Sequence, residues 1–302
     1  MTNNETACRI AVDAALRERL NRLVRKEIDR TLPVATIAKL LEGGFAGISS
    51  LANMEKATDG RLLEKAIVAI AESNPNLVVL TQLKLPVRED ALELVDKNSE
   101  ALLRGLSFDA NARTRRSYAP DLVLIDRSTR IACIVDIKRS LASYESVRIT
   151  ELRHRMLAAA LVLPDLLWKE HRRIAVDEVH VVILEASGKR TDPQAGVWNI
   201  THLDHLLGVA GAAQLVQQVQ SDFAALAEAN LLGALQLIRQ TSPAAGSGEC
   251  LITGADSSDD LTGIDEAEDG SSHKIQRDGA NSLGHRKRLI RFGIATPPDP
   301  VH

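Results

Sequence analysis

Apolar residues recur every three or four positions in the N-terminal part of the chain, which is the spacing of one face of an α-helix. The pattern covers about residues 11–54. A second helical pattern begins near Asp59. It is expected to end near Ser73, because Pro75 disfavours helical geometry at the residue before it.

The middle of the chain has the short apolar runs that predict β-strands. Residues 76–87 (NLVVLTQLKLPV) form the first run, with Pro86 close to its end. Two more runs flank the polar turn Arg127–Arg130 and predict a β-hairpin over residues 120–138. Residues 177–186 form a continuous apolar run, the pattern of a strand that is covered on both faces.

Helical patterns connect and follow these strands. We expect a short helix in the connector 87–118, a longer helix over about 145–162, and a last helical region over about 203–240. The central order is therefore helix, three strands, helix, strand. This order predicts an α/β protein with a central mixed β-sheet flanked by helices, and with extra N- and C-terminal helices.

The composition changes beyond Thr241 to Ser, Gly, Asp and Glu with few large apolar residues, so residues 243–302 are predicted to be mostly disordered. Residues 249–269 contain eight acids and no Lys or Arg. Since the whole chain carries a net charge of -3, the remainder carries +5, which is compatible with a nucleic-acid partner. The basic run 285–293 (HRKRLIRFG) either contacts phosphates or is a solvated part of the tail.

The cysteines bear on the compartment. Cys8, Cys133 and Cys250 match no metal-ligand spacing, and Cys133 lies in an apolar strand, where it is expected to be a small buried side chain. This usage favours a reducing cytoplasm. The chain start lacks the features of a signal peptide, and no apolar run is long enough for a membrane span. We therefore expect a cytoplasmic protein with no membrane segment.

The hairpin carries the strongest chemical signal. If its turn is symmetric about Ser128-Thr129, Asp121 lies opposite Asp136, and Lys138 projects from the same face as Asp136. Opposed Cβ atoms are about 5 Å apart, so the two carboxylates repel each other unless a cation lies between them. Paired oxygen ligands suit Mg²⁺, which together with a Lys can position a water for attack on phosphorus. The pattern indicates phosphodiester chemistry.

Pro120-Asp121 followed by Asp136-Ile137-Lys138 resembles the signature of the PD-(D/E)xK nuclease superfamily. The resemblance implies the restriction-endonuclease-like αβββαβ core, in the order of elements expected above. It implies Asp121 and Asp136 as Mg²⁺ ligands, with Mn²⁺ as a substitute ion and the backbone carbonyl of Ile137 as a further ligand. It also implies that Lys138 orients or activates the attacking water.

The family often supplies another acid from the preceding helix, and Glu64 is the candidate for this catalytic and metal-binding role. Glu64 borders the apolar stripe of its helix, so it either reaches the site or forms a surface pair with Arg61. The expected organisation is an N-terminal helical region (1–57), a nuclease-like core (58–187), a C-terminal helical region packed on the core (188–242), and the disordered acidic and basic tail (243–302).

The expected function is that of a Mg²⁺-dependent nuclease that hydrolyses phosphodiester bonds of nucleic acid, with DNA endonuclease as the favoured activity. The alternative is a catalytically silent nuclease-like domain that serves as a nucleic-acid- or protein-binding module. Either reading allows a homodimer and a protein partner for the tail. An aromatic content of 3% argues against a single-strand binder built on stacked bases.

Overall fold

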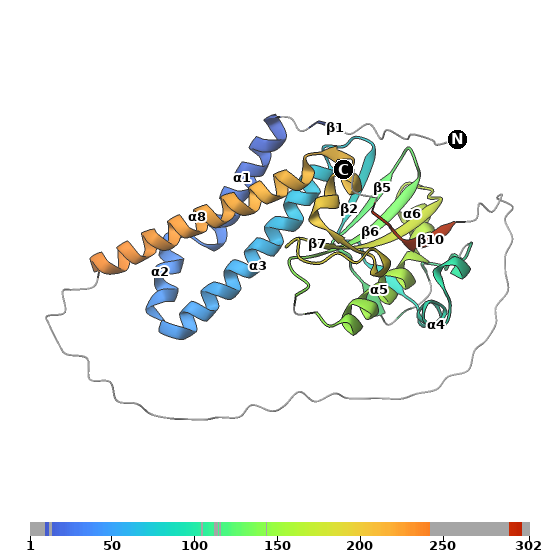
Figure 1. The fold of residues 1–302 in the computed structure, drawn as a ribbon, viewed down its shortest axis with the longest axis horizontal. Helices are drawn as coiled ribbons and strands as arrows, with labels where there is room; N and C mark the ends of the chain where they lie inside the picture. The colour runs from blue at the N-terminus through green and yellow to red at the C-terminus, as the bar shows by residue number, and fades with distance from the viewer. Residues whose placement is uncertain are drawn as a thin grey trace, which may run out of the picture.

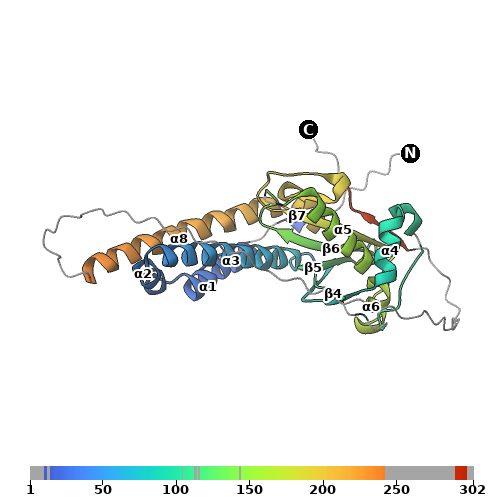
Figure 2. The ribbon, with the colours of Figure 1, turned by 90° about the horizontal axis from the view of Figure 1, so that it is seen from below.

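The computed structural model describes residues 10–11, 14–103, 105–111, 114, 116–142, 144–241 and 290–297 of the chain. These residues form an α/β part around a central mixed sheet, and an arm of helices that projects from it (Figures 1 and 2). None of the described helices is both long and apolar enough to cross a bilayer.

The arm consists of helices from both ends of the described chain. Its members are α1 (Ala14–Thr31), α2 (Val34–Glu42), α3 (Gly44–Ala71) and α8 (Ala212–Thr241). Their apolar faces share one core, in which Leu20, Ile67 and Phe223 are buried. The corner between α2 and α3 needs glycine, because a Cβ at Gly47 would lie 1.6 Å from the carbonyl oxygen of Leu40.

Helix α3 runs from the arm into the α/β part without interruption (Figure 1). The expected boundary between residues 57 and 58 therefore falls inside a helix, and the helix predicted from Asp59 begins at Gly44 instead. Gly60 disfavours a helix by about 1 kcal/mol relative to Ala. Burial of the flanking residues, including Thr58 and Leu62, offsets that cost.

The central sheet is mixed, as the sequence predicts. Five of its six described strands are β2 (Leu77–Thr81), β5 (Leu122–Asp126), β6 (Ile131–Lys138), β7 (Glu178–Glu185) and β10 (Arg291–Ile294), which lie in this spatial order. Strands β2, β5 and β6 are antiparallel, whereas β7 is parallel to β6. A parallel neighbour requires a crossover, which α5 (Ser146–Ala160) and α6 (Leu163–Glu170) supply.

Alternate residues of the sheet enter two separate cores. Leu124 and Cys133 face the core shared with the arm. Val123 and Ile134 face the core formed with α5 and α6. Cys133 behaves as the expected small apolar side chain, since burial raises the pKa of its thiol to about 12 and keeps the thiol protonated.

The segment 76–87, expected as one strand, divides into two. Gln82 has a φ of 58°, which ends the extended backbone after β2. The remainder forms β3 (Leu85–Val87), which pairs with β4 (Arg116–Tyr118) in a small separate sheet. Between them the connector contains the expected short helix, α4 (Glu89–Lys97), followed by the 3₁₀ turn η1 (Glu100–Leu103).

The other short elements complete the described chain. They are β1 (Ile10–Ala11), η2 (Pro193–Ala195), β8 (Val197–Asn199), η3 (Ile200–His202), α7 (Leu203–Leu207) and β9 (Val209–Ala210). Strand β1 pairs with β9 in parallel, and β8 pairs with the C-terminal half of β7.

The expectation of disorder over residues 243–302 is wrong for residues 290–297. Strand β10 pairs in parallel with the N-terminal half of β7, and Phe292 is buried. The indole N–H of Trp198 donates to the carbonyl of Ala295 at 2.7 Å, which fixes the segment after the strand. Residues 242–289 and 298–302, including most of the basic run, lie outside the described residues.

Candidate functional site

The β5–β6 hairpin brings two acidic residues together. Its register pairs Leu122 with Val135, and one further step places Asp121 opposite Asp136. The turn holds this register, since the carboxylate of Asp126 accepts the backbone N–H of Ser128 at 2.7 Å. The hairpin and its register, as predicted from the sequence, are confirmed over the paired residues.

Asp136 is buried, with 5% of its surface exposed, and two polar groups contact its carboxylate. The hydroxyl of Tyr118 donates to its Oδ2 at 2.8 Å. Its Oδ1 forms an ion pair with the ammonium of Lys138 but accepts no well-formed hydrogen bond. Burial tends to lower the pKa of Lys138, but the attraction of Asp136 outweighs it and the pKa is raised. Lys138 therefore stays charged.

Asp121 is partly buried at the start of β5. Its Oδ2 accepts the backbone N–H of Ile137 at 2.5 Å. Burial raises the pKa of Asp121, the Ile137 hydrogen bond opposes this, and the negative charge of Asp136 raises the pKa further. The ionised form of Asp121 is consequently less stable here than in water.

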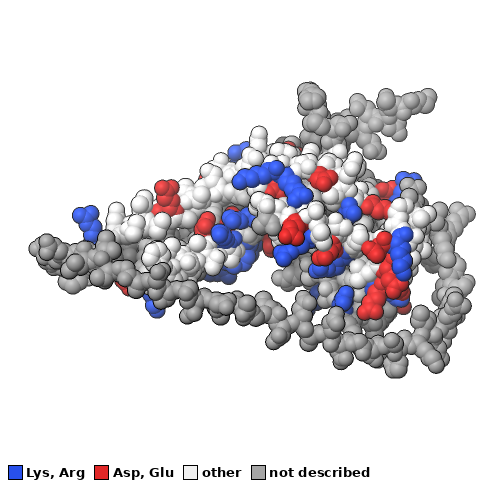
Figure 3. All heavy atoms as spheres, turned by 60° about the horizontal axis from the view of Figure 1, so that its bottom comes forward, with Lys and Arg blue, Asp and Glu red and all other residues white. Residues whose placement is uncertain are grey.

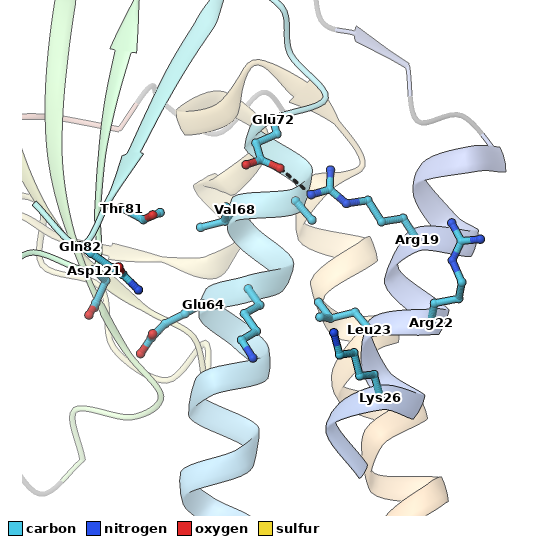
Figure 4. Close-up of a pocket in the computed structure, with 12 residues that line it drawn as sticks. Arg19, Arg22, Leu23, Lys26, Glu64, Val68, Glu72, Thr81, Gln82 and Asp121 are labelled. Atoms are coloured by element: carbon cyan, nitrogen blue, oxygen red, sulfur yellow. Dashed lines mark hydrogen bonds and ion pairs between the residues drawn. The ribbon is translucent and has the colours of Figure 1, made fainter. Parts of the chain in front are cut away.

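Glu64 approaches the same region from α3. Figure 4 shows its carboxylate directed toward Asp121. Burial, followed by repulsion from Asp121, raises the pKa of Glu64. The surface pair with Arg61, one of the two alternatives open from the sequence, is not formed, because Arg61 donates to Thr58 at 3.0 Å instead.

A cavity of about 530 Å³ lies beside these carboxylates. It crosses the surface of α3 from the sheet to α1, and we call it the α3 groove (Figure 4). Glu64 and Asp121 line it at the sheet end. Asp136 and Lys138 are not among its lining residues, so two of the four candidate side chains line this cavity.

The carboxylates of Glu64, Asp121 and Asp136 are of the type that binds a hard cation, but they do not form a preorganised metal site. Three carboxylates supply only oxygen donors, and the Oδ1 of Asp136 is contacted by the Lys138 ammonium, in the place that a cation would take. Within the described part of the chain, however, no three acidic, His or Cys side chains are arranged as a metal-ligand set. Binding a cation would require Asp136 to loosen its contact with Lys138.

Two buried groups near the site were not found from the sequence. Tyr118 lies in β4 of the small separate sheet, and its hydroxyl contacts Asp136 of the central sheet. Glu185 is beside Lys138 in the β6–β7 register, but the hydroxyl of Ser187 and the N–H of Lys189 donate to its carboxylate. Glu185 therefore stabilises the loop after β7. A tyrosine close to the Pro-Asp pair is too weak a signal to identify in one sequence.

Comparisons with protein-family models, curated proteins and solved structures give no match to this chain.

Proposed function

We propose that the protein is a Mg²⁺-dependent nuclease that hydrolyses phosphodiester bonds of nucleic acid, with DNA as the favoured substrate and internal cleavage as the favoured mode. The observation that carries the proposal is the opposition of Asp121 and Asp136 across the hairpin, with Lys138 in contact with Asp136. When the intervening β3, α4, β4 and α6 are set aside, the order α3, β2, β5, β6, α5, β7 agrees with the αβββαβ order that the resemblance implies, which supports the same reading.

The chain's own groups suggest their roles. Asp121, Asp136 and Glu64 would hold the cation, with the carbonyl of Ile137 as a further donor. When bound, the cation lowers the pKa of a coordinated water and offsets charge on the phosphate. Lys138 now neutralises Asp136, and its ammonium would then orient the attacking water and stabilise negative charge in the transition state.

A second candidate is a catalytically silent nuclease-like module that binds nucleic acid or protein. It is favoured by the contacts that already occupy the carboxylates, since Tyr118 and Lys138 contact Asp136, and the N–H of Ile137 donates to Asp121. In such a module this network would serve stability alone.

The test uses plasmid DNA, linear DNA and RNA with purified full-length protein, in Mg²⁺ or Mn²⁺ and in EDTA. We expect cleavage in the divalent cations only. Asp136→Ala should abolish cleavage and weaken Mg²⁺ binding measured by calorimetry. Lys138→Ala should abolish cleavage but leave Mg²⁺ binding largely intact, and Lys138→Arg should not restore full activity, because a planar guanidinium does not replace a compact ammonium.

Two results would contradict the nuclease proposal. Equal cleavage by wild type and Asp136→Ala would indicate a contaminating nuclease. Absence of cleavage on every substrate, together with absence of Mg²⁺ binding, would favour the silent module.

A further inference from the structure

The two ends of the α3 groove differ in charge. The sheet end has the carboxylates of Glu64 and Asp121, whereas α1 contributes Arg19, Arg22 and Lys26 beyond α3 (Figure 4). On the face shown in Figure 3, basic side chains gather around the junction between the arm and the α/β part, with acidic side chains among them. The local arrangement, rather than the net charge, therefore decides where an anion binds.

The basic residues of the groove are not equally available to a ligand. Arg19 is held by Glu72 at 2.5 Å, and Lys65 pairs with the buried carboxylate of Glu27. Among the described residues Arg22 pairs only with Glu18, at 3.1 Å, and both of these side chains are about 70% exposed. Such an exposed pair is weak and easily exchanged for another anion.

Lys26 completes the available pair of cations. It is exposed, and no ion pair joins it to any of the described residues. Arg22 and Lys26 are four residues apart on α1, so they lie on the same helical face, one turn from each other. Two available cations along one face suit an extended anion with regularly spaced charges.

We infer that Arg22 and Lys26 bind phosphates of one nucleic-acid strand, whose scissile phosphodiester lies at the sheet end of the α3 groove. This inference rests on the proposed function. Arg22 and Lys26 lie across α3 from Glu64 and Asp121, so a strand that they bind passes over α3 to reach the sheet end. The contacts are to the backbone, so they position the strand without reading its sequence.

The experiment measures binding of a fluorescein-labelled single-stranded oligodeoxynucleotide, and of its duplex, by anisotropy at several salt concentrations. Full-length protein is used in EDTA, so that no cleavage is needed for the readout. Arg22→Ala/Lys26→Ala is expected to weaken binding and to reduce the slope of log affinity against log salt by about 1.4 for the single strand, or about 0.7 for each lost phosphate contact.

The matched control is Arg17→Ala/Arg25→Ala, which removes the same charge from exposed positions of α1 that do not line the groove. Its salt slope should equal that of the wild type. Equal losses in both double variants would overturn the inference, because only the net charge would then matter. An unchanged slope in Arg22→Ala/Lys26→Ala would overturn it as well.

Failure of this inference can be distinguished from failure of the proposed function. If the wild type cleaves nucleic acid in Mg²⁺ and the salt slope of Arg22→Ala/Lys26→Ala is unchanged, the proposed function stands and phosphate binding by Arg22 and Lys26 is rejected. If binding depends on Arg22 and Lys26 but the wild type does not cleave nucleic acid in Mg²⁺, phosphate binding by these two residues stands and the silent module is favoured. No binding and no cleavage would reject both.

Discussion

Replacing Tyr118 with Phe removes one hydroxyl from the candidate site and leaves its shape almost unchanged. The hydroxyl donates to the Asp136 carboxylate at 2.8 Å, and the two residues are 6% and 5% exposed. A hydrogen bond to a charged group contributes about 1.5–3 kcal/mol, and water cannot easily replace it at a buried oxygen. We therefore expect Tyr118→Phe to lower the free energy of unfolding by about 2 kcal/mol.

Urea denaturation followed by circular dichroism measures this free energy. The control is Tyr144→Phe, the chain's other tyrosine, whose hydroxyl has no hydrogen bond to a described residue. If Asp136 holds a metal, Mg²⁺ should stabilise Tyr118→Phe more than the wild type, because the cation meets a carboxylate oxygen that has lost its donor. A loss within about 0.5 kcal/mol of that in Tyr144→Phe would refute the reasoning about this bond.

Two other predictions concern stability. Phe292 is buried, so Phe292→Ala should lower the free energy of unfolding, measured in urea, by about 3 kcal/mol. Arg291 is exposed, and Arg291→Ala should change this free energy little. Equal effects of the two variants would mean that β10 does not dock on β7. The pKa of Glu64 is raised, so its ionised form destabilises the fold, and the free energy of unfolding falls as pH rises through the raised pKa. Glu64→Gln should therefore be more stable than the wild type at about pH 8. This advantage should disappear toward about pH 4. Glu72→Gln, which loses the Arg19 pair, should show no such gain, and a pH-independent difference for Glu64→Gln would contradict the site electrostatics.

The hairpin was predictable because its information is local. A short polar turn between two apolar runs fixes the pairing, and the pairing alone brings Asp121 opposite Asp136. Glu64 became a candidate because the resemblance implies an acid from the preceding helix and because helical periodicity placed Glu64 at the border of an apolar stripe. These parts of the site depend on neighbours within one or two elements.

The parts that were missed depend on distant packing. Gln82 adopts a left-handed φ of 58°, which is uncommon for a residue other than Gly, Asn or Asp. The break between β2 and β3 could therefore not be predicted from the sequence. The helix expected to begin near Asp59 is the second half of α3, because packing along α3 offsets the cost of Gly60. Strand β10 is a few apolar residues in a polar region, and it becomes a strand only because β7 offers an unpaired edge. Tyr118 reaches Asp136 through the β3–β4 sheet, which the sequence pattern did not reveal.

The late position of β10 in the chain affects how the protein is completed on the ribosome. Strand β7 ends at Glu185 and β10 ends at Ile294, so 109 residues must be added between them. At about 5–20 residues per second, this takes about 5–20 s. During that time the Glu178–Val181 edge of the nascent sheet has no partner strand, although β8 can already cover Ile183–Glu185. Translation speed over the last third of the message thus sets how long an aggregation-prone edge is exposed to other nascent chains.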